Sequence, residues 1–141
     1  MNQINNIQDE IIDEFAFFGD WMEKYEYIID LGKSLPLIDE QYKNEDHIIK
    51  GCQSQVWLHA DDEEGKVKFT ADSDAVITKG IIALLIRVLS GQKPEDIAQS
   101  DLYFIDKIGL KEHLSPTRSN GLVSMVKQIK MYGLTLNAKA G

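Results

Sequence analysis

The fold is decided by residues 56–91, which read VWLHADDEEGKVKFTADSDAVITKGIIALLIRVLSG. Val56 and Leu58 alternate with polar residues, an acidic turn ends at Gly65, and apolar residues alternate again over positions 67–71. Alternation on both sides of a turn predicts a β-hairpin. Trp57, inside the first strand, is expected to be an anchor of the hydrophobic core.

The predicted hairpin leads directly into a strongly apolar segment. Asp72, Ser73 and Asp74 stand immediately before it and offer side-chain oxygens for an N-cap. The residues that follow predict a central helix over roughly 75–90, which Gly91 ends. We assign the two carboxylates to this helix start, where the helix dipole favours negative charge, and not to a cation site.

Apolar residues at helical spacing predict further helices on both sides of this unit. We expect one helix at residues 4–16 and a second that starts after an N-cap at Asp20 and ends near Gly32. A short helical turn should begin at Pro94, and a last helix should begin near Pro116 and end by Gly133. Helices around a hairpin, without alternating βαβ units, predict an α+β domain with helices packed on a small antiparallel sheet. Because a lone hairpin is only marginally stable, we expect about three strands, the third within residues 36–49.

Length and composition limit the possible functions. We expect residues 1–141 to form a single domain, long enough to bury a core without disulfides or metals. The net charge of -8 disfavours nucleic acid and anionic lipid surfaces, so a protein partner is expected. The longest apolar run, residues 80–86, is too short to span a membrane. One cysteine and a polar amino-terminal stretch favour a reducing compartment, and we expect the cytoplasm.

The one cysteine, Cys52, lies in a polar loop that leads into the first predicted strand. A single thiol cannot form an internal disulfide, and the Gly, Gln and Ser around it do not make an apolar core. Gly51 can adopt backbone angles closed to other residues and lets another backbone approach the sulfur. The loop therefore predicts a reactive thiol, positioned by Gly51, Gln53 and Ser54.

Three blocks of the chain, in order, resemble the SufE family of sulfur-acceptor proteins. They are Gly51 to Leu58, Asp72-Ser73-Asp74-Ala75 with Lys79-Gly80, and the run from His113 to Leu122, which reads HLSPTRSNGL. A looser fourth match covers Trp21 to Gly32. This resemblance implies a SufE/IscU-like α+β fold and a sulfur carrier with no cofactor of its own, rather than a stand-alone enzyme.

As the resemblance implies, a pyridoxal-phosphate cysteine desulfurase of the SufS type forms a persulfide on its own cysteine, and Cys52 takes up the terminal sulfur. The Cys52 persulfide then delivers it to an iron–sulfur cluster scaffold of the SufBCD type, and the desulfurase turns over faster. The matching arginine of the family, Arg118 here, is associated with the cysteine loop, where a permanent cation could stabilise a thiolate or persulfide. We expect a lowered Cys52 pKa.

Other readings of the same residues stay open. A free cysteine is most often a small buried hydrophobe. Cys52 could instead serve a redox-sensing thiol protein, or the chain could be a binding module that activates a desulfurase without using its thiol. His47, His59 and His113 have no recognised metal-ligand spacing, so we expect neither a Cys-His hydrolase nor a metal site.

Overall fold

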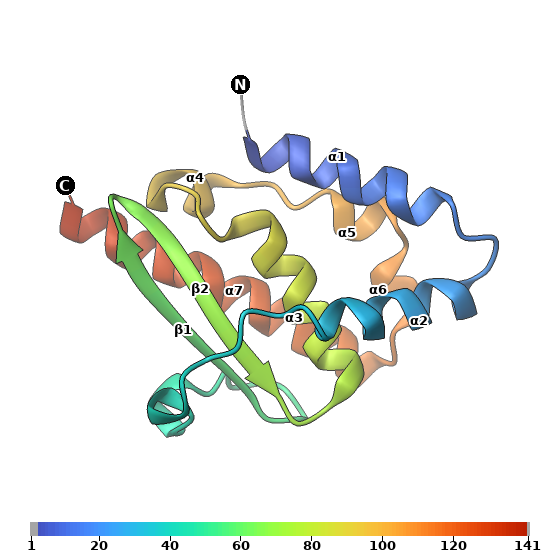
Figure 1. The fold of residues 1–141 in the computed structure, drawn as a ribbon, viewed down its shortest axis with the longest axis horizontal. Coiled ribbons are helices and arrows are strands. Elements are labelled where there is room, and N and C mark those ends of the chain that lie inside the picture. The colour runs from blue at the N-terminus through green and yellow to red at the C-terminus, as the bar shows by residue number, and fades with distance from the viewer. Residues whose placement is uncertain (1–2, 141) are drawn as a thin grey trace.

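The computed structural model describes residues 3–140, with the elements arranged as in Figure 1. The helices are α1 (Gln3–Ala16), α2 (Trp21–Gly32), α3 (Val76–Leu89), α4 (Pro94–Gln99), α5 (Phe104–Lys107), α6 (Leu110–His113) and α7 (Pro116–Ala140). The strands are β1 (Val56–Glu63) and β2 (Lys66–Ser73), and two short 3-10 helices, η1 (Glu40–Tyr42) and η2 (Glu45–His47), precede them.

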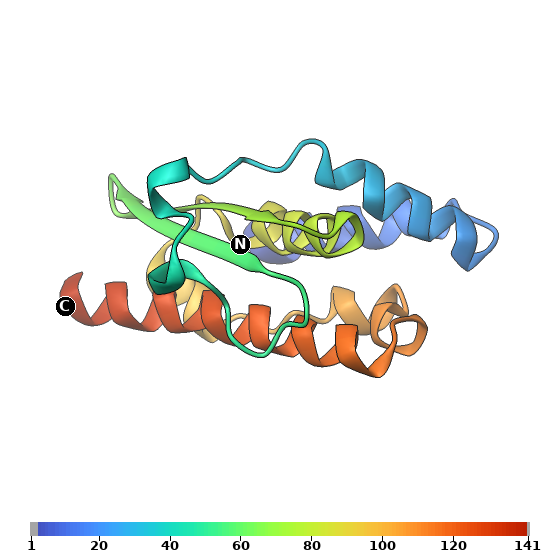
Figure 2. The ribbon, with the colours of Figure 1, turned by 90° about the horizontal axis from the view of Figure 1, so that it is seen from below.

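The hairpin is antiparallel, with Leu58 opposite Ala71 and Ala60 opposite Phe69. These residues share one face of the sheet, because side chains alternate between faces along each strand. The long helix α7 runs along this side of the hairpin (Figure 2). Its Tyr132 ring lies 6.3 Å from the Phe69 ring, and the Tyr132 hydroxyl donates to the Leu58 carbonyl at 3.4 Å. The predicted α+β architecture is thus confirmed.

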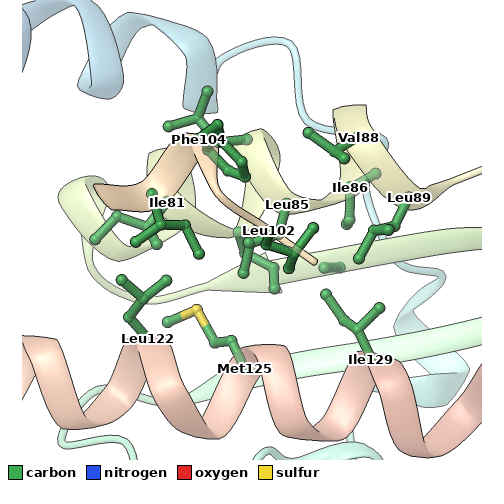
Figure 3. Close-up of a cluster of buried hydrophobic side chains, with 14 of the residues drawn as sticks. Ile81, Leu85, Ile86, Val88, Leu89, Leu102, Phe104, Leu122, Met125 and Ile129 are labelled. Carbon is green, nitrogen blue, oxygen red and sulfur yellow. The ribbon is translucent and has the colours of Figure 1, made fainter. Parts of the chain in front are cut away.

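Helix α3 forms the centre of the core. Ten of its residues are buried, spread over most of its circumference, as expected for a helix covered by protein on nearly all sides. Figure 3 shows Leu122, Met125 and Ile129 of α7 pointing toward α3, where Ile81 and Leu85 meet them. The prediction of a central apolar helix after the hairpin is therefore confirmed.

Helix α2 packs on α3 at a point where neither helix has a side chain. Gly80 of α3 lies so close to α2 that an added Cβ would be 2.0 Å from the Ile28 carbonyl oxygen. A Cβ on Gly32 of α2 would be 3.0 Å from the Gly80 nitrogen. Two glycines therefore set the distance between these helices, and α2 also supports part of the site described below.

Helix α1 is fixed to its neighbours by a charged cluster. Arg87 of α3 donates to both oxygens of Glu14, at 2.8 and 2.5 Å, and the Tyr27 hydroxyl donates to Glu14 at 2.5 Å. The hydrogen bonds from Arg87 outweigh partial burial and lower the pKa of Glu14. This bidentate pair ties α1, α2 and α3 together and leaves the Arg87 charge neutralised by its partner.

The expected third strand is not formed within the described residues. The segment from 36 to 49 instead makes one bridge to each edge of the hairpin, Leu37 with Ala71 and Ile48 with Trp57. Between these bridges, the Asp39 and Asn44 side chains accept hydrogen bonds from the backbone N–H groups two residues ahead and start the two 3-10 helices. Such local bonds compete with a continuous ladder, so the sheet has two strands.

Two expectations about single residues were wrong. Asp72 and Asp74 do not cap α3, whose N-cap position is Ala75. The Asp72 carboxylate instead binds Lys43 and Lys79, at 2.7 and 3.3 Å. Trp57 is only partly buried, on the face of the sheet opposite to Leu58, with the Lys43 ammonium 5.5 Å from its ring centre. Alternation along β1 places neighbouring residues on opposite faces, so burying Val56 and Leu58 turns Trp57 outward.

The last helix is longer than expected, since α7 continues past Gly133 to Ala140. Gly133 is an interior contact and not a helix end: an added Cβ would lie 3.0 Å from Ile97 Cγ2 and 3.1 Å from the Pro94 carbonyl of α4. Its missing side chain therefore serves helix packing. Among the described residues, no helix has the length and apolar character needed to cross a membrane.

Candidate functional site

The Cys52 loop connects the irregular segment before the hairpin to β1, and both its ends are fixed. At its start, the Ile49 N–H donates to the Val56 carbonyl at 2.8 Å. At its end, the Gln55 N–H donates to the Asp74 carboxylate at 3.1 Å, and the Ser73 hydroxyl donates to the Gln55 carbonyl at 2.8 Å. The turn that was expected to cap α3 therefore holds the base of the cysteine loop.

Gly51 is required by both its backbone angle and its surroundings. Its φ of +94° lies in a region that favours glycine. An added Cβ would also lie 2.4 Å from the Ser124 hydroxyl oxygen of α7. We expected Gly51 to let another backbone approach the sulfur, and the group that the structure places against Gly51 is instead the Ser124 side chain of α7.

The Cys52 side chain is half-buried against the core and points toward the first turns of α7. Its Sγ lies 3.6 Å from the Gly121 carbonyl oxygen, a contact that suits a weak S–H donor. An added Cβ on Gly121 would be 3.5 Å from Sγ, an ordinary van der Waals distance. The backbone of α7 at Gly121 therefore lies directly against the thiol.

A small pocket of about 60 Å³ adjoins the sulfur. Cys52, Gln53 and Ser54 form one side of it, and the rest of its lining comes from α3 and α7, namely Thr78, Ile81, Thr117, Arg118, Gly121 and Met125. A cavity needs only about 10–15 Å³ to admit one water-sized group, so one further atom beside Sγ can be accommodated.

The pKa of the Cys52 thiol is raised above its ordinary value by burial, which disfavours the thiolate. The sequence led us to expect a lowered pKa, and in this conformation that expectation was wrong. Burial therefore favours the protonated thiol, which is less reactive than the thiolate.

Arg118 lies in the first turn of α7, which begins at Pro116. The Ser115 hydroxyl accepts a hydrogen bond from the Arg118 N–H at 3.3 Å and serves as the helix cap. The Arg118 side chain is exposed and donates from Nη1 to the Tyr25 hydroxyl of α2 at 2.7 Å. The structure thus brings Arg118 and Cys52, 66 positions apart in sequence, to one pocket.

The structure brings all five predicted site residues, Gly51, Cys52, Gln53, Ser54 and Arg118, to one loop and the adjoining end of α7. Sequence reasoning missed Tyr25 and Gly121. Tyr25 lies inside the looser fourth match to the family, and Gly121 lies inside the quoted HLSPTRSNGL run, but neither residue was given a role at the site. These two family-like stretches were the signals available for them.

The histidines lie elsewhere. His113 stacks on Trp21 with ring centres 4.2 Å apart, and His59 stacks on Tyr42 at 3.7 Å. No histidine lines the Cys52 pocket, and the described part of the chain has no group of three or more His, Cys, Asp or Glu side chains placed to hold a metal ion.

Comparison with known proteins agrees with this site. The family model SufE, an Fe-S metabolism associated domain, matches residues 9–133. The chain belongs to the SufE family. An uncharacterised SufE-like protein of Rhizobium meliloti (strain 1021) is 44% identical over 127 residues, covering 86% of this chain and 91% of the relative. The SufE-like protein 1, chloroplastic/mitochondrial, of Arabidopsis thaliana is 40% identical over 131 residues, covering 92% of this chain but 35% of that longer protein.

A solved structure supports the SufE-like fold. The solution structure of a hypothetical protein from Thermus thermophilus matches with a TM-score of 0.77, covering 94% of this chain and 96% of that one. Its sequence identity is 21%, so this likeness concerns the fold alone. The family match associates the chain with Fe–S metabolism.

Proposed function

We propose that this protein accepts sulfane sulfur as a Cys52 persulfide from a pyridoxal-phosphate cysteine desulfurase of the SufS type and delivers it to an iron–sulfur cluster scaffold of the SufBCD type. The observation that carries the proposal is the setting of the chain's only thiol. Cys52 lies on the SufE-like loop, half-buried, beside a pocket with room for one more atom.

The transfer is an exchange between sulfurs and needs no added oxidant. The Cys52 thiolate attacks the terminal sulfur of the desulfurase persulfide, a new Sγ–S bond forms, and the S–S bond on the desulfurase breaks. The electron pair leaves on the desulfurase cysteine as a thiolate. Removing this sulfur frees the desulfurase for another turnover, so the protein acts as its activator and as a carrier rather than as a stand-alone enzyme.

Burial of the resting thiol means that docking must expose it. Cys52 contacts α7 through Gly121, and the two sulfurs of different proteins must come within bonding reach. The loop therefore swings outward when the desulfurase docks, a movement of the kind that often gates catalysis. After transfer, the persulfide can return to the pocket, which shelters it from oxidants. A reactive thiol of this kind suits a reducing compartment, and we place the protein in the cytoplasm.

The test is incubation of the protein with a cysteine desulfurase and free cysteine, followed by intact-mass measurement. Wild type gains the mass of one sulfur atom, which reductant or cyanide removes, and Cys52→Ser gains none. Desulfurase turnover is measured with both proteins. Normal stimulation by Cys52→Ser would identify a thiol-independent binding module. Sulfenic acid at Cys52 after peroxide treatment, without sulfur uptake from desulfurase, would identify a redox-sensing thiol.

A further inference from the structure

Helix α2 contacts the end of α6 and the first turn of α7, through two of its residues that lie one helical turn apart. Trp21 stacks on His113 with an angle of 18° between the rings, and the Tyr25 hydroxyl accepts the hydrogen bond from Arg118. Residues four apart lie on the same face of a helix, so both contacts come from one side of α2. This side of α2 thus fixes the part of the chain that carries Arg118.

The Tyr25 hydroxyl holds the Arg118 guanidinium through a hydrogen bond, and within the described residues that side chain forms no other hydrogen bond or ion pair. An exposed arginine has high rotamer entropy, so without an acceptor its charge would spread over many positions in solvent. Arg118 nevertheless lines the pocket next to Cys52, and the tyrosine hydroxyl is what holds it at that wall.

The chemical nature of the acceptor matters. The chain has two arginines, and Arg87 is bound by both carboxylate oxygens of Glu14, which neutralises its charge. Arg118 is held by a neutral hydroxyl, which orients the guanidinium and leaves its positive charge available to an anion. When Cys52 is deprotonated or carries a persulfide, the anionic sulfur lies next to the same pocket when the loop is in this position.

We propose that Tyr25 is a positioning residue for sulfur transfer, holding Arg118 where its charge stabilises the anionic sulfur of Cys52. This inference rests on the proposed function, which makes Cys52 the sulfur acceptor. Tyr25 acts through Arg118 and does not touch the sulfur, so its contribution depends on the presence of the guanidinium.

The test uses Tyr25→Phe, which removes the hydroxyl and keeps the ring. Two readouts are measured: the pH profile of Cys52 alkylation in the free protein, and the rate of sulfur uptake from a desulfurase. We expect the alkylation midpoint to move by about 0.5 pH unit to higher pH and uptake to slow about three-fold, since one pKa unit corresponds to a ten-fold change in equilibrium. Thermal unfolding confirms that the variant is folded.

Two further variants distinguish positioning from a structural effect. Tyr103→Phe removes a tyrosine hydroxyl that lies away from the site and donates a 2.8 Å hydrogen bond to the Asp9 carboxylate. This variant should behave as wild type. Tyr25→Phe in an Arg118→Ala background should add nothing, because residues that act through one another are non-additive. The inference is overturned if Tyr25→Phe matches wild type in both readouts, or if its effect persists without Arg118. Because alkylation needs no desulfurase, it decides the Tyr25 role even if wild type accepts no sulfur.

Discussion

Substitution of Gly80 by alanine tests the packing of α2 on α3. We expect it to destabilise the protein, whereas the same substitution usually stabilises a helix. In an exposed helix, glycine to alanine stabilises by about 1 kcal/mol. Here the new Cβ would lie 2.0 Å from the Ile28 carbonyl oxygen and 2.7 Å from the Ile28 carbonyl carbon. These are backbone atoms of a helix, which cannot rotate away as a flexible side chain can.

The size of the effect follows from the movement required. Real Cβ atoms essentially never come within 3.0 Å of such a neighbour, so α2 must move away from α3 by about 1 Å. A gap of 0.5–1 Å already removes about a quarter to a half of the dispersion energy of the atoms concerned. Overpacking typically costs about 1–3 kcal/mol and occasionally more, and two helices shift here, so we expect a net loss of about 3 kcal/mol.

Urea denaturation followed by circular dichroism measures the loss. Gly19→Ala is the matched control, because an added Cβ at Gly19 has no atom within 4 Å, and its stability should stay within about 0.5 kcal/mol of wild type. If Gly80→Ala is as stable as wild type, α2 and α3 are not packed as closely as the structure shows. Since α2 carries Tyr25, a folded Gly80→Ala protein should also take up sulfur more slowly.

Three further predictions concern the thiol and the charged cluster. Alkylation of Cys52 should be slow in the free protein, where burial raises the thiol pKa, and faster with saturating desulfurase; equal rates would count against exposure on docking. Arg118→Ala should move the Cys52 alkylation profile to higher pH and slow sulfur uptake, and Arg118→Lys should keep part of the effect; superimposable curves would leave Arg118 without a role at the sulfur. The pKa of Glu14 is lowered by hydrogen bonds from Arg87, so its contribution to stability is present above the ordinary pKa of 4.5 and is lost as pH falls through the lowered value. Between about pH 6 and about pH 3, the urea midpoint should therefore fall less in Glu14→Gln than in wild type. An equal fall of the midpoint in both proteins would refute the contribution of the Glu14 carboxylate to stability.

The sequence predicted the elements whose signals are local. Alternation over 56–71 gave the hairpin, helical periodicity gave α1, α2 and α3, and Asp20 does cap α2 by accepting from the Glu23 N–H at 2.9 Å. These patterns can be read directly because each arises from neighbours within one or two turns of chain. The Cys52 loop was likewise recognisable from consecutive residues.

Packing between distant segments decided the rest. Asp72 is an ion-pair partner rather than a cap because Lys43 and Lys79 reach it from other elements. The sequence predicted that the last helix ends near Gly133, but Gly133 lies inside that helix and contacts α4. The sequence also predicted a lowered pKa for the single cysteine, but burial against α7 raises that pKa. The contact between Tyr25 and Arg118 joins residues 93 positions apart. No local sequence pattern encodes such a pair. The contact depends on tertiary packing, because the positions of α2 against α3 and of α7 against the core bring the surfaces of α2 and α7 side by side.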